Sequence, residues 1–135
     1  MSVVEKFLAV DYIHVHSFHC ILLYMKSILL IEDHDRLAEI LSRKFREYDV
    51  RIAANGLEGL KLIEERTPDL IITDLNMPVM DGVTFIKNCK ATMKIIVLTN
   101  CPDMLGVKKL KRDITLMIKN EVDLQDVCQM VRSLI

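Results

Sequence analysis

The 135-residue sequence contains no tryptophan, and aromatic residues make up only 5% of it. Many RNA-binding modules stack bases on exposed aromatic side chains, so this composition disfavours RNA recognition. The net charge at pH 7 is only −1, whereas a surface that binds the phosphates of DNA carries a clustered basic excess. We therefore expect no direct contact with nucleic acid.

The sequence also lacks an uninterrupted apolar segment of the length that a membrane span requires, about 20 residues. Residues 1–24 come nearest, but Asp11 and three histidines interrupt them. The four cysteines form no Cys-x-x-Cys pair, and the chain shows no cleavable signal pattern. These absences predict a cytoplasmic protein with reduced thiols and without a membrane span.

Residues 1–24 differ in character from the rest of the chain. One interpretation is an extension upstream of the natural start, because Met25-Lys26-Ser27 leads directly into an apolar strand pattern. The alternative is an added segment that packs as an extra strand or helix. A metal site built from the histidines of this segment and Cys20 is a weaker hypothesis, because no further ligand lies nearby in the sequence to complete a tetrahedron.

From residue 25 onward, short apolar runs alternate with longer amphipathic segments, and these patterns predict buried strands and helices respectively. The expected strands are 28–31, 50–53, 70–73, 94–99 and 114–118, and the expected helices are 34–48, 56–66, 81–89, 102–111 and 123–134. Five strands that alternate with five helices predict a parallel sheet covered on both sides, a doubly wound α/β domain. Periodicity alone does not choose the order of the strands.

Asp74 directly follows the apolar run 70–73. An isolated Asp at such a place commonly ends a strand or opens a turn. In an open parallel sheet, however, the carboxyl ends of the strands meet at one edge, and ligands bind there. The residues that end the other strands therefore decide between the two interpretations.

The other strand ends carry related chemistry: Glu32 and Asp33 follow the first strand, Thr99 ends the fourth, and Lys119 follows the fifth. Carboxylates that lie close together repel one another and favour a hard divalent cation such as Mg²⁺. Lys119 and Thr99 add a cation and a hydroxyl donor, which suit a phosphoryl group beside the metal. Taken singly, the carboxylates could cap the next helix, and Thr99 and Lys119 could be ordinary strand and surface residues.

These residues and their spacing resemble the receiver domain of two-component response regulators. The resemblance is carried by Ile31-Glu32-Asp33, by Asp74-Leu75-Asn76-Met77-Pro78-Val79-Met80-Asp81-Gly82, by Val97-Leu98-Thr99 and by Lys119. It covers residues 25–135, which would be the receiver domain. It implies a flavodoxin-like doubly wound sheet of five parallel strands in the order 2-1-3-4-5.

The resemblance also implies a role for each site residue. Asp74 would be the phosphoacceptor, Thr99 the switch hydroxyl, and Lys119 the cation that pairs with Asp74 or its phosphoryl group. Mg²⁺ would be held by Glu32, Asp33, Asp74 and the backbone carbonyl of Asn76. A sensor histidine kinase or phosphotransfer protein would supply the phosphoryl group, and a downstream protein partner would read the change. Such a domain is not an enzyme beyond assisting its own phosphorylation and dephosphorylation.

Three positions depart from the usual receiver pattern. Leu116 stands where receivers usually carry an aromatic residue whose rotation follows the switch hydroxyl. Asn100 replaces a small residue after the Thr, and Asn120 replaces a proline after the Lys, which removes the expected reason for a cis peptide bond. These departures favour a second hypothesis, a phosphorylation-independent interaction module on the same fold.

Two further features of the sequence remain. A small phosphatase or flavin protein on a similar sheet fits poorly. Asn76 replaces the second Asp of the Asp-x-Asp motif of such phosphatases, and the acidic residues after the first strand would repel the phosphate of a flavin cofactor.

A basic group spans the fourth expected helix and the residues after it: Lys108, Lys109, Lys111 and Arg112. We interpret it mainly as a solvated face, and alternatively as a surface for an acidic partner.

Overall fold

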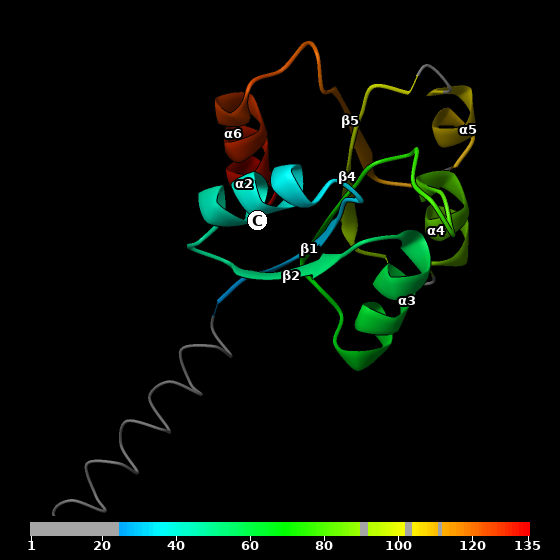
Figure 1. Ribbon diagram of the computed structural model, residues 1–135, viewed down its shortest axis with the longest axis horizontal. Helices are drawn as coiled ribbons and strands as arrows, with labels where there is room; N and C mark the ends of the chain where they lie inside the picture. Colours follow the sequence, from blue (N-terminus) through cyan, green and yellow to red (C-terminus); the bar gives the residue numbers. More distant parts are fainter. Residues whose placement is uncertain (1–24, 90–91, 102–103, 111) are drawn as a thin grey trace, which may run out of the picture.

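The computed structural model describes residues 25–135 except 90–91, 102–103 and 111 (Figure 1). The hypotheses on residues 1–24 lie outside this part. The described elements are β1 (Ser27–Ile31), α2 (Asp35–Lys44), β2 (Asp49–Ala53), α3 (Gly56–Glu65), β3 (Leu70–Thr73), α4 (Gly82–Asn88), β4 (Lys94–Thr99), α5 (Met104–Lys108), β5 (Ile114–Ile118) and α6 (Leu124–Leu134). None of these helices has the length and apolar character of a membrane-spanning helix.

The strands form one parallel sheet in the order β2-β1-β3-β4-β5, which confirms the predicted fold. In register, Ile31 of β1 pairs with Thr73 of β3, and Thr99 of β4 pairs with Ile118 of β5. The carboxyl ends of the strands therefore lie along one edge, and the residues that follow these strands meet there.

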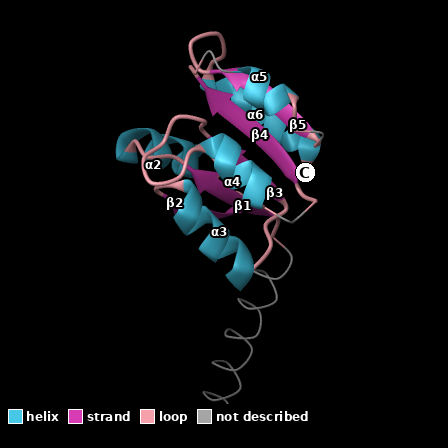
Figure 2. Ribbon diagram, turned by 90° about the vertical axis from the view of Figure 1, so that its right-hand side faces the viewer, coloured by secondary structure: helices cyan, strands magenta, loops and turns pink. Residues whose placement is uncertain are grey.

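Helices cover the sheet on both faces, and each face has its own hydrophobic core (Figure 2). Ile28 and Leu30 of β1 face the core shared with α2 and α6, whereas Leu29 and Ile31 face the core shared with α3, α4 and α5. This alternation follows from the two-residue period of a strand. All five residues of β1 are buried, as expected for a strand covered on both sides.

The predicted helix 34–48 is too long, because α2 ends at Lys44. Phe45, which is only 1% exposed, turns into the core after that residue. The backbone N–H of Tyr48 donates to Phe45 O at 2.8 Å, and the N–H of Asp49 donates to Lys26 O at 3.0 Å. Pairing of β2 with β1 therefore ends the helix before residue 48, although the residues up to 48 keep a helical spacing.

Arg112 does not belong to a solvated basic face, which corrects part of the prediction for that group. Its Nη1 donates to the backbone oxygens of Ile86 at 2.8 Å and Cys89 at 2.6 Å. The guanidinium thus satisfies carbonyl groups at the end of α4, where a positive charge also suits the helix dipole. Lys108 and Lys109 are exposed, as expected, and Lys111 lies outside the described residues.

Candidate functional site

Asp74 follows β3 and is only 6% exposed. Its Oδ1 accepts hydrogen bonds from the backbone N–H of Leu75 at 2.6 Å, the N–H of Asn76 at 3.3 Å and the hydroxyl of Thr99 at 2.7 Å. Its Oδ2 accepts one from Lys119 Nζ at 2.6 Å. Asp74 therefore opens a turn and also accepts hydrogen bonds from residues at the ends of two other strands. The interpretation as a turn residue and the interpretation as part of a ligand site are therefore compatible.

Lys119 links two carboxylates at the same edge. Its backbone N–H donates to Thr99 O at 3.0 Å and extends the pairing of β4 with β5 by one bond. Its Nζ lies 2.6 Å from Asp74 Oδ2 and 2.8 Å from Glu32 Oε2, and its side chain is 17% exposed. The sequence therefore placed Lys119, Asp74, Glu32 and Thr99 correctly in one cluster.

The ion pair between Asp74 and Lys119 shifts the pKa of both groups. Burial alone would raise the pKa of Asp74, but hydrogen bonds from Lys119 and Thr99 outweigh it, so this pKa lies below its usual value. Burial alone would lower the pKa of Lys119, but hydrogen bonds to Asp74 and Glu32 outweigh it, so this pKa lies above its usual value. Both groups are charged at neutral pH, so Asp74 is a carboxylate and Lys119 an ammonium group.

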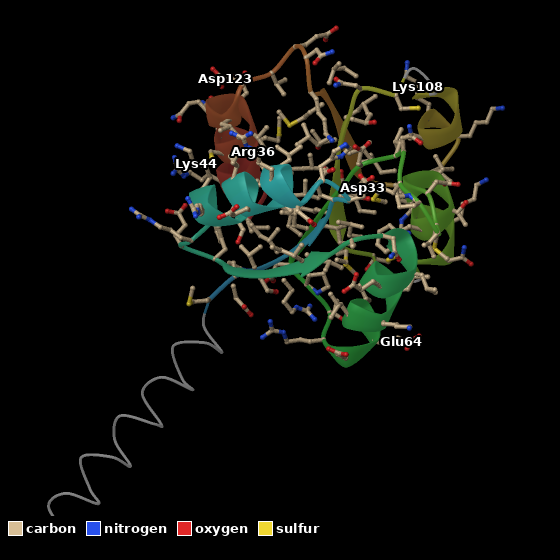
Figure 3. All side chains as sticks on the ribbon, in the orientation of Figure 1. Asp33, Arg36, Lys44, Glu64, Lys108 and Asp123 are labelled. Carbon is tan, nitrogen blue, oxygen red and sulfur yellow. The ribbon has the colours of Figure 1, made fainter. Side chains whose placement is uncertain are left out.

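Glu32 and Asp33 follow β1 at its carboxyl end, and Glu32 contacts Lys119 of this ion pair. Figure 3 labels Asp33 at this end of the strand. Glu32 is 3% exposed, and its N–H donates to Ala53 O at 3.0 Å. Neither residue is the cap of α2: the N-cap is His34, which makes no capping bond through its side chain. The alternative that Glu32 and Asp33 only cap a helix therefore does not hold.

His34 is a site residue that the sequence analysis missed. Its Nδ1 lies 3.0 Å from Glu32 Oε1 and 3.2 Å from Asp33 Oδ1. The hydrogen bond to Glu32 and the charges of Asp33 and Glu32 raise the pKa of His34. No periodic pattern reports the direction of a side chain at the start of a helix, so only the closeness of His34 to the acidic pair in sequence could have indicated it.

The carboxylates of Glu32, Asp33 and Asp74 fit a divalent cation. Within the described part of the chain, Lys119 is the one cationic side chain that contacts both Glu32 and Asp74, and it balances one of three negative charges. His34 contacts Glu32 and Asp33 and adds a positive charge only when it is protonated. Asp33 Oδ1 is buried and has no hydrogen-bond partner among the described residues, although such an atom normally has one. Carboxylate oxygens with excess negative charge are the ligand set that Mg²⁺ prefers.

The loop after β3 holds the backbone of Asp74 tightly. The N–H of Gly82 donates to Leu75 O at 2.9 Å, and a Cβ at Gly82 would lie 2.1 Å from Asp74 O. Val79, between these residues, has a φ of 68°, which is strained for a β-branched residue. Gly82 of the motif is therefore needed for close packing behind Asp74.

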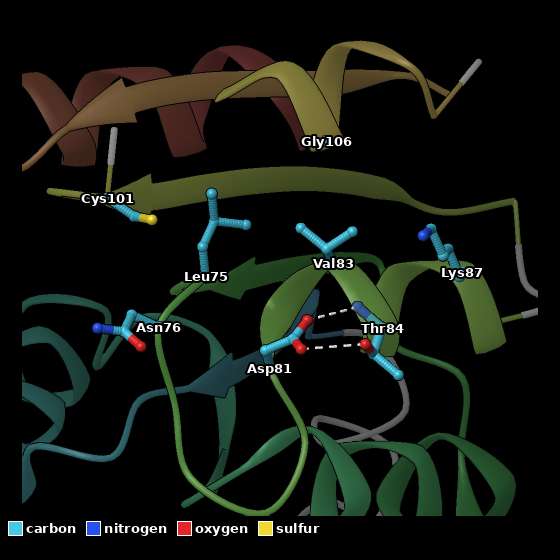
Figure 4. Close-up of a pocket in the computed structure, with 8 residues that line it drawn as sticks. All are labelled: Leu75, Asn76, Asp81, Val83, Thr84, Lys87, Cys101 and Gly106. Atoms are coloured by element: carbon cyan, nitrogen blue, oxygen red, sulfur yellow. Dashed lines mark hydrogen bonds between the residues drawn. The ribbon is translucent and has the colours of Figure 1, made fainter. Parts of the chain in front are cut away.

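Asp81 caps α4 as predicted, and beside it a cavity of about 430 Å³ separates α4 from the loop after β4 (Figure 4). Asp81 accepts hydrogen bonds from Thr84 N at 2.7 Å and Thr84 Oγ1 at 3.1 Å. Asn76 and Cys101 line the same cavity. The loop that carries Cys101 thus has open space next to it, close to the residues that follow Asp74.

The three departures from the receiver pattern lie around Thr99 and Lys119. Asn100 Nδ2 donates to Asn120 Oδ1 at 3.2 Å, and Asn120 N donates to Asn100 Oδ1 at 3.0 Å. The described residues contain no cis peptide bond, as expected without a proline at position 120. Leu116 is partly buried against the core beneath α4 and α5.

Comparisons with known proteins agree with this geometry. The family model described as the response regulator receiver domain matches residues 28–132. The transcriptional regulatory protein AfsQ1 of Streptomyces coelicolor is 41% identical over 87 residues, which cover 62% of this chain and 39% of that protein. Sporulation initiation phosphotransferase F of Bacillus subtilis is 30% identical over 79 residues, which cover 55% of this chain and 64% of that protein.

A solved structure shares the fold. The response regulator protein TrrA of Thermotoga maritima, in complex with Mg²⁺ and BeF, is similar with a TM-score of 0.69 and 26% identity over 82% of this chain and 100% of that chain. The chain spans about 40% of the length of the first curated relatives it matches. Because the family model covers most of the chain, this protein belongs to the response regulator receiver domain family.

Proposed function

We propose that this receiver domain accepts a phosphoryl group on Asp74 from a sensor histidine kinase or phosphotransfer protein in the cytoplasm. The observation that supports this most is the convergence of Thr99 and Lys119 on one buried carboxylate that lies beside Glu32 and Asp33. The phosphorylated form then changes its affinity for a downstream protein partner. The domain assists only its own phosphorylation and dephosphorylation, and acts on no other substrate.

Oδ2 of Asp74 is the better nucleophile of its two carboxylate oxygens. Oδ1 accepts three hydrogen bonds, whereas the described residues give Oδ2 one, from Lys119. A lone pair of Oδ2 forms the new bond to phosphorus, while the bond between phosphorus and the donor's histidine nitrogen breaks with its electron pair leaving on that nitrogen. Lys119 neutralises charge on the transferring oxygens, and Oδ1 stays anchored during the step.

Mg²⁺ fits this proposal as a resident cation. Glu32, Asp33, Asp74 and the backbone carbonyl of Asn76 would hold it, and the bound cation would stabilise negative charge on the phosphoryl oxygens. The buried Oδ1 of Asp33, which accepts no hydrogen bond from the described residues, supports the assignment. So does the structural relative TrrA, which was solved with Mg²⁺ and a BeF group.

Thr99 connects Asp74 with the loop after β4. Its hydroxyl donates to Asp74 Oδ1 at 2.7 Å and accepts from the backbone N–H of Cys101 at 3.0 Å. A phosphoryl group on Asp74 offers new acceptor oxygens to this hydroxyl, so the hydroxyl and the N–H that it holds shift together. The loop and α5 then change between two arrangements, and a partner that binds one of them better reads the signal.

A phosphodonor assay tests the proposal. The chain is incubated with Mg²⁺ and acetyl phosphate or phosphoramidate, and its intact mass is measured. We expect the addition of one phosphate in the wild type and in Asp113→Asn, an exposed carboxylate that serves as the control, and no addition in Asp74→Asn. No phosphate uptake by the wild type, or uptake that persists in Asp74→Asn, would defeat the proposal.

A second candidate function is a phosphorylation-independent interaction module. The specific observation that favours it is the pair of hydrogen bonds between Asn100 and Asn120, which join the two loops beside the site. The matching test is a downstream partner isolated with the wild type. Equal affinity of that partner for the wild type with phosphodonor, the wild type without it, and Asp74→Ala supports this second function over the first.

The domain is proposed to comprise residues 25–135, with residues 1–24 as an extension of the chain. The support is the apolar strand pattern that begins directly after Met25-Lys26. Mass spectrometry of the protein from its native source tests this division. A mature chain that starts at Met1 would contradict the interpretation of residues 1–24 as lying upstream of the natural start.

A further inference from the structure

His34 lies at the N-cap of α2, but its side chain does not cap the helix. Its Nδ1 instead lies close to both members of the acidic pair, 3.0 Å from Glu32 Oε1 and 3.2 Å from Asp33 Oδ1. The ligand atoms of these three residues all lie within 4.8 Å of one another. An imidazole nitrogen and two carboxylate oxygens therefore converge on one small volume.

Hydrogen bonding accounts for only one of these two contacts. The contact between His34 and Glu32 satisfies hydrogen-bond geometry. Asp33 Oδ1, in contrast, has no hydrogen-bond partner although the atom is buried. His34 Nδ1 can form an ion pair with Asp33 Oδ1 when the imidazole is protonated, but this oxygen accepts no hydrogen bond from the described residues. Such a buried atom is normally satisfied by water or an ion.

The spacing of these atoms matches neighbouring ligands of one metal ion. Two adjacent ligands of an octahedral ion with bonds of about 2.1 Å lie about 3 Å apart. The separations of 3.0 and 3.2 Å from His34 Nδ1 to the two carboxylates are of this size. The two carboxylate oxygens of Glu32 have different partners, because Lys119 contacts Oε2 and His34 contacts Oε1.

We infer that His34 supplies a nitrogen ligand to the divalent cation held beside Glu32 and Asp33, and so gives this receiver a preference for Co²⁺, Ni²⁺ or Zn²⁺ over Mg²⁺. The inference rests on the metal site of the proposed function. Oxygen ligands alone suit Mg²⁺ and Mn²⁺, whereas an imidazole adds affinity for the later first-row metals. His34 is exposed over 71% of its side chain, so the ring can turn to receive an ion without disturbing the core.

The test measures metal binding at equilibrium, without any phosphodonor. Because His14, His16, His19 and Cys20 are further potential ligands in the sequence, the full-length chain carries Ala at the three histidines and Ser at the cysteine in every sample. CoCl₂ and MgCl₂ are titrated separately by calorimetry, and the visible absorption of bound Co²⁺ is recorded. His34→Ala and His34→Gln are compared with this background, and Asp35→Asn, an exposed neighbour, is the control.

We expect both His34 variants to lose about 10- to 100-fold in Co²⁺ affinity while Mg²⁺ affinity stays within a few-fold, and the Co²⁺ absorption to change as nitrogen is lost from its ligands. Unchanged Co²⁺ affinity overturns the inference. An equal loss for both metals also overturns it, because His34 would then only position the carboxylates. Neither result bears on phosphate uptake at Asp74 with Mg²⁺, so the failure of this inference is distinguishable from failure of the proposed function.

Discussion

Asn100 and Asn120 exchange two hydrogen bonds across the loops that follow β4 and β5. The last backbone bond between these strands runs from Lys119 N to Thr99 O. Beyond it, the side-chain oxygen of Asn100 accepts the N–H of Asn120, and the Asn100 amide donates to the Asn120 side chain in return. The residues on either side of the site are thus held together one position past the sheet.

This pair should be thermodynamically coupled. We expect Asn100→Ala and Asn120→Ala each to lower the free energy of unfolding by about 0.5–1.5 kcal/mol, with the larger loss in Asn100→Ala, which removes both bonds. The double variant should be less destabilised than the sum, because both changes remove the bond from Asn100 Nδ2 to Asn120 Oδ1. Urea unfolding of the four proteins measures the coupling. Asn88→Ala, which removes a side-chain bond to Thr84 O on α4, should add to either single change. Strict additivity of the two loop changes would contradict the paired geometry.

Gly82→Ala should destabilise the domain by about 1–3 kcal/mol, the usual cost of overpacking. The added Cβ would lie 2.1 Å from the backbone oxygen of Asp74, which cannot move aside as a side chain can. Gly59→Ala is a matched comparison, because its nearest obstacle is the Cδ1 methyl of Ile31 at 2.6 Å and alanine favours the helix. Thermal unfolding compares the two, and an equal loss would argue against a rigid backbone contact.

Acid should weaken the wild type more than Asp74→Asn. The pKa of Asp74 is lowered in the folded protein, so its carboxylate contributes stability that is fully present above the unfolded value, about 3.9. That contribution is lost as the pH falls through the folded-state pKa. Urea unfolding from pH 6 downward measures the slopes. Parallel curves for the two proteins would show that Asp74 gains no net stabilisation of its charge on folding.

Whereas lowering the pH destabilises the folded domain through Asp74, raising the pH should do so through Lys119. Its pKa is raised in the folded protein, so its contribution is present below the unfolded value, about 10.4, and is lost as the pH rises through the folded-state pKa. We expect the stability of Lys119→Met to change less between pH 9 and pH 11 than that of the wild type. Lys26→Met, which removes a half-exposed surface lysine, should follow the wild-type curve. If Lys119→Met followed the wild-type curve and Lys26→Met changed less, the ion pair of Lys119 would not be the cause of the pH dependence.

Mg²⁺ should stabilise the folded domain, because it relieves repulsion among Glu32, Asp33 and Asp74. At a concentration 100 times its dissociation constant, a ligand specific for the folded state adds about 2.7 kcal/mol to the free energy of unfolding. Asp33→Asn should abolish most of this gain, EDTA should reverse it, and Asp35→Asn should retain it. Thermal unfolding at several Mg²⁺ concentrations is the measurement, and no shift in the wild type would rule out the metal site.

The sequence predicted the elements well because strands and helices here are strongly patterned. The candidate site was predictable too, since Asp74, Thr99 and Lys119 each end a strand and a parallel sheet brings strand ends together. The order of the strands was also predicted correctly, but from the family resemblance, because periodicity does not determine it. The roles of the site residues come from the same resemblance and remain predictions.

What the sequence could not predict depends on contacts between distant residues. Helix α2 ends at Lys44, ahead of the pairing of β2 with β1 that begins at Asp49. Arg112 satisfies carbonyls at the end of α4, 26 positions away for Ile86, and no local pattern reports such a bond. The hydrogen bonds between Asn100 and Asn120 also join residues that are distant in the sequence. In the sequence, each of the two residues is visible only as a departure from the usual receiver pattern.

The two separate cores have a consequence for how a signal could pass through the domain. Glu32 and Asp33 lead into α2, which packs on one face of the sheet, whereas Thr99 leads toward α5, which packs on the other. Asp74 lies at the edge between these layers and contacts Thr99 directly and Glu32 through Lys119. A protein that docks over α2 and one that docks over α5 would therefore occupy opposite sides of the molecule. They could communicate through one carboxylate without competing for the same surface.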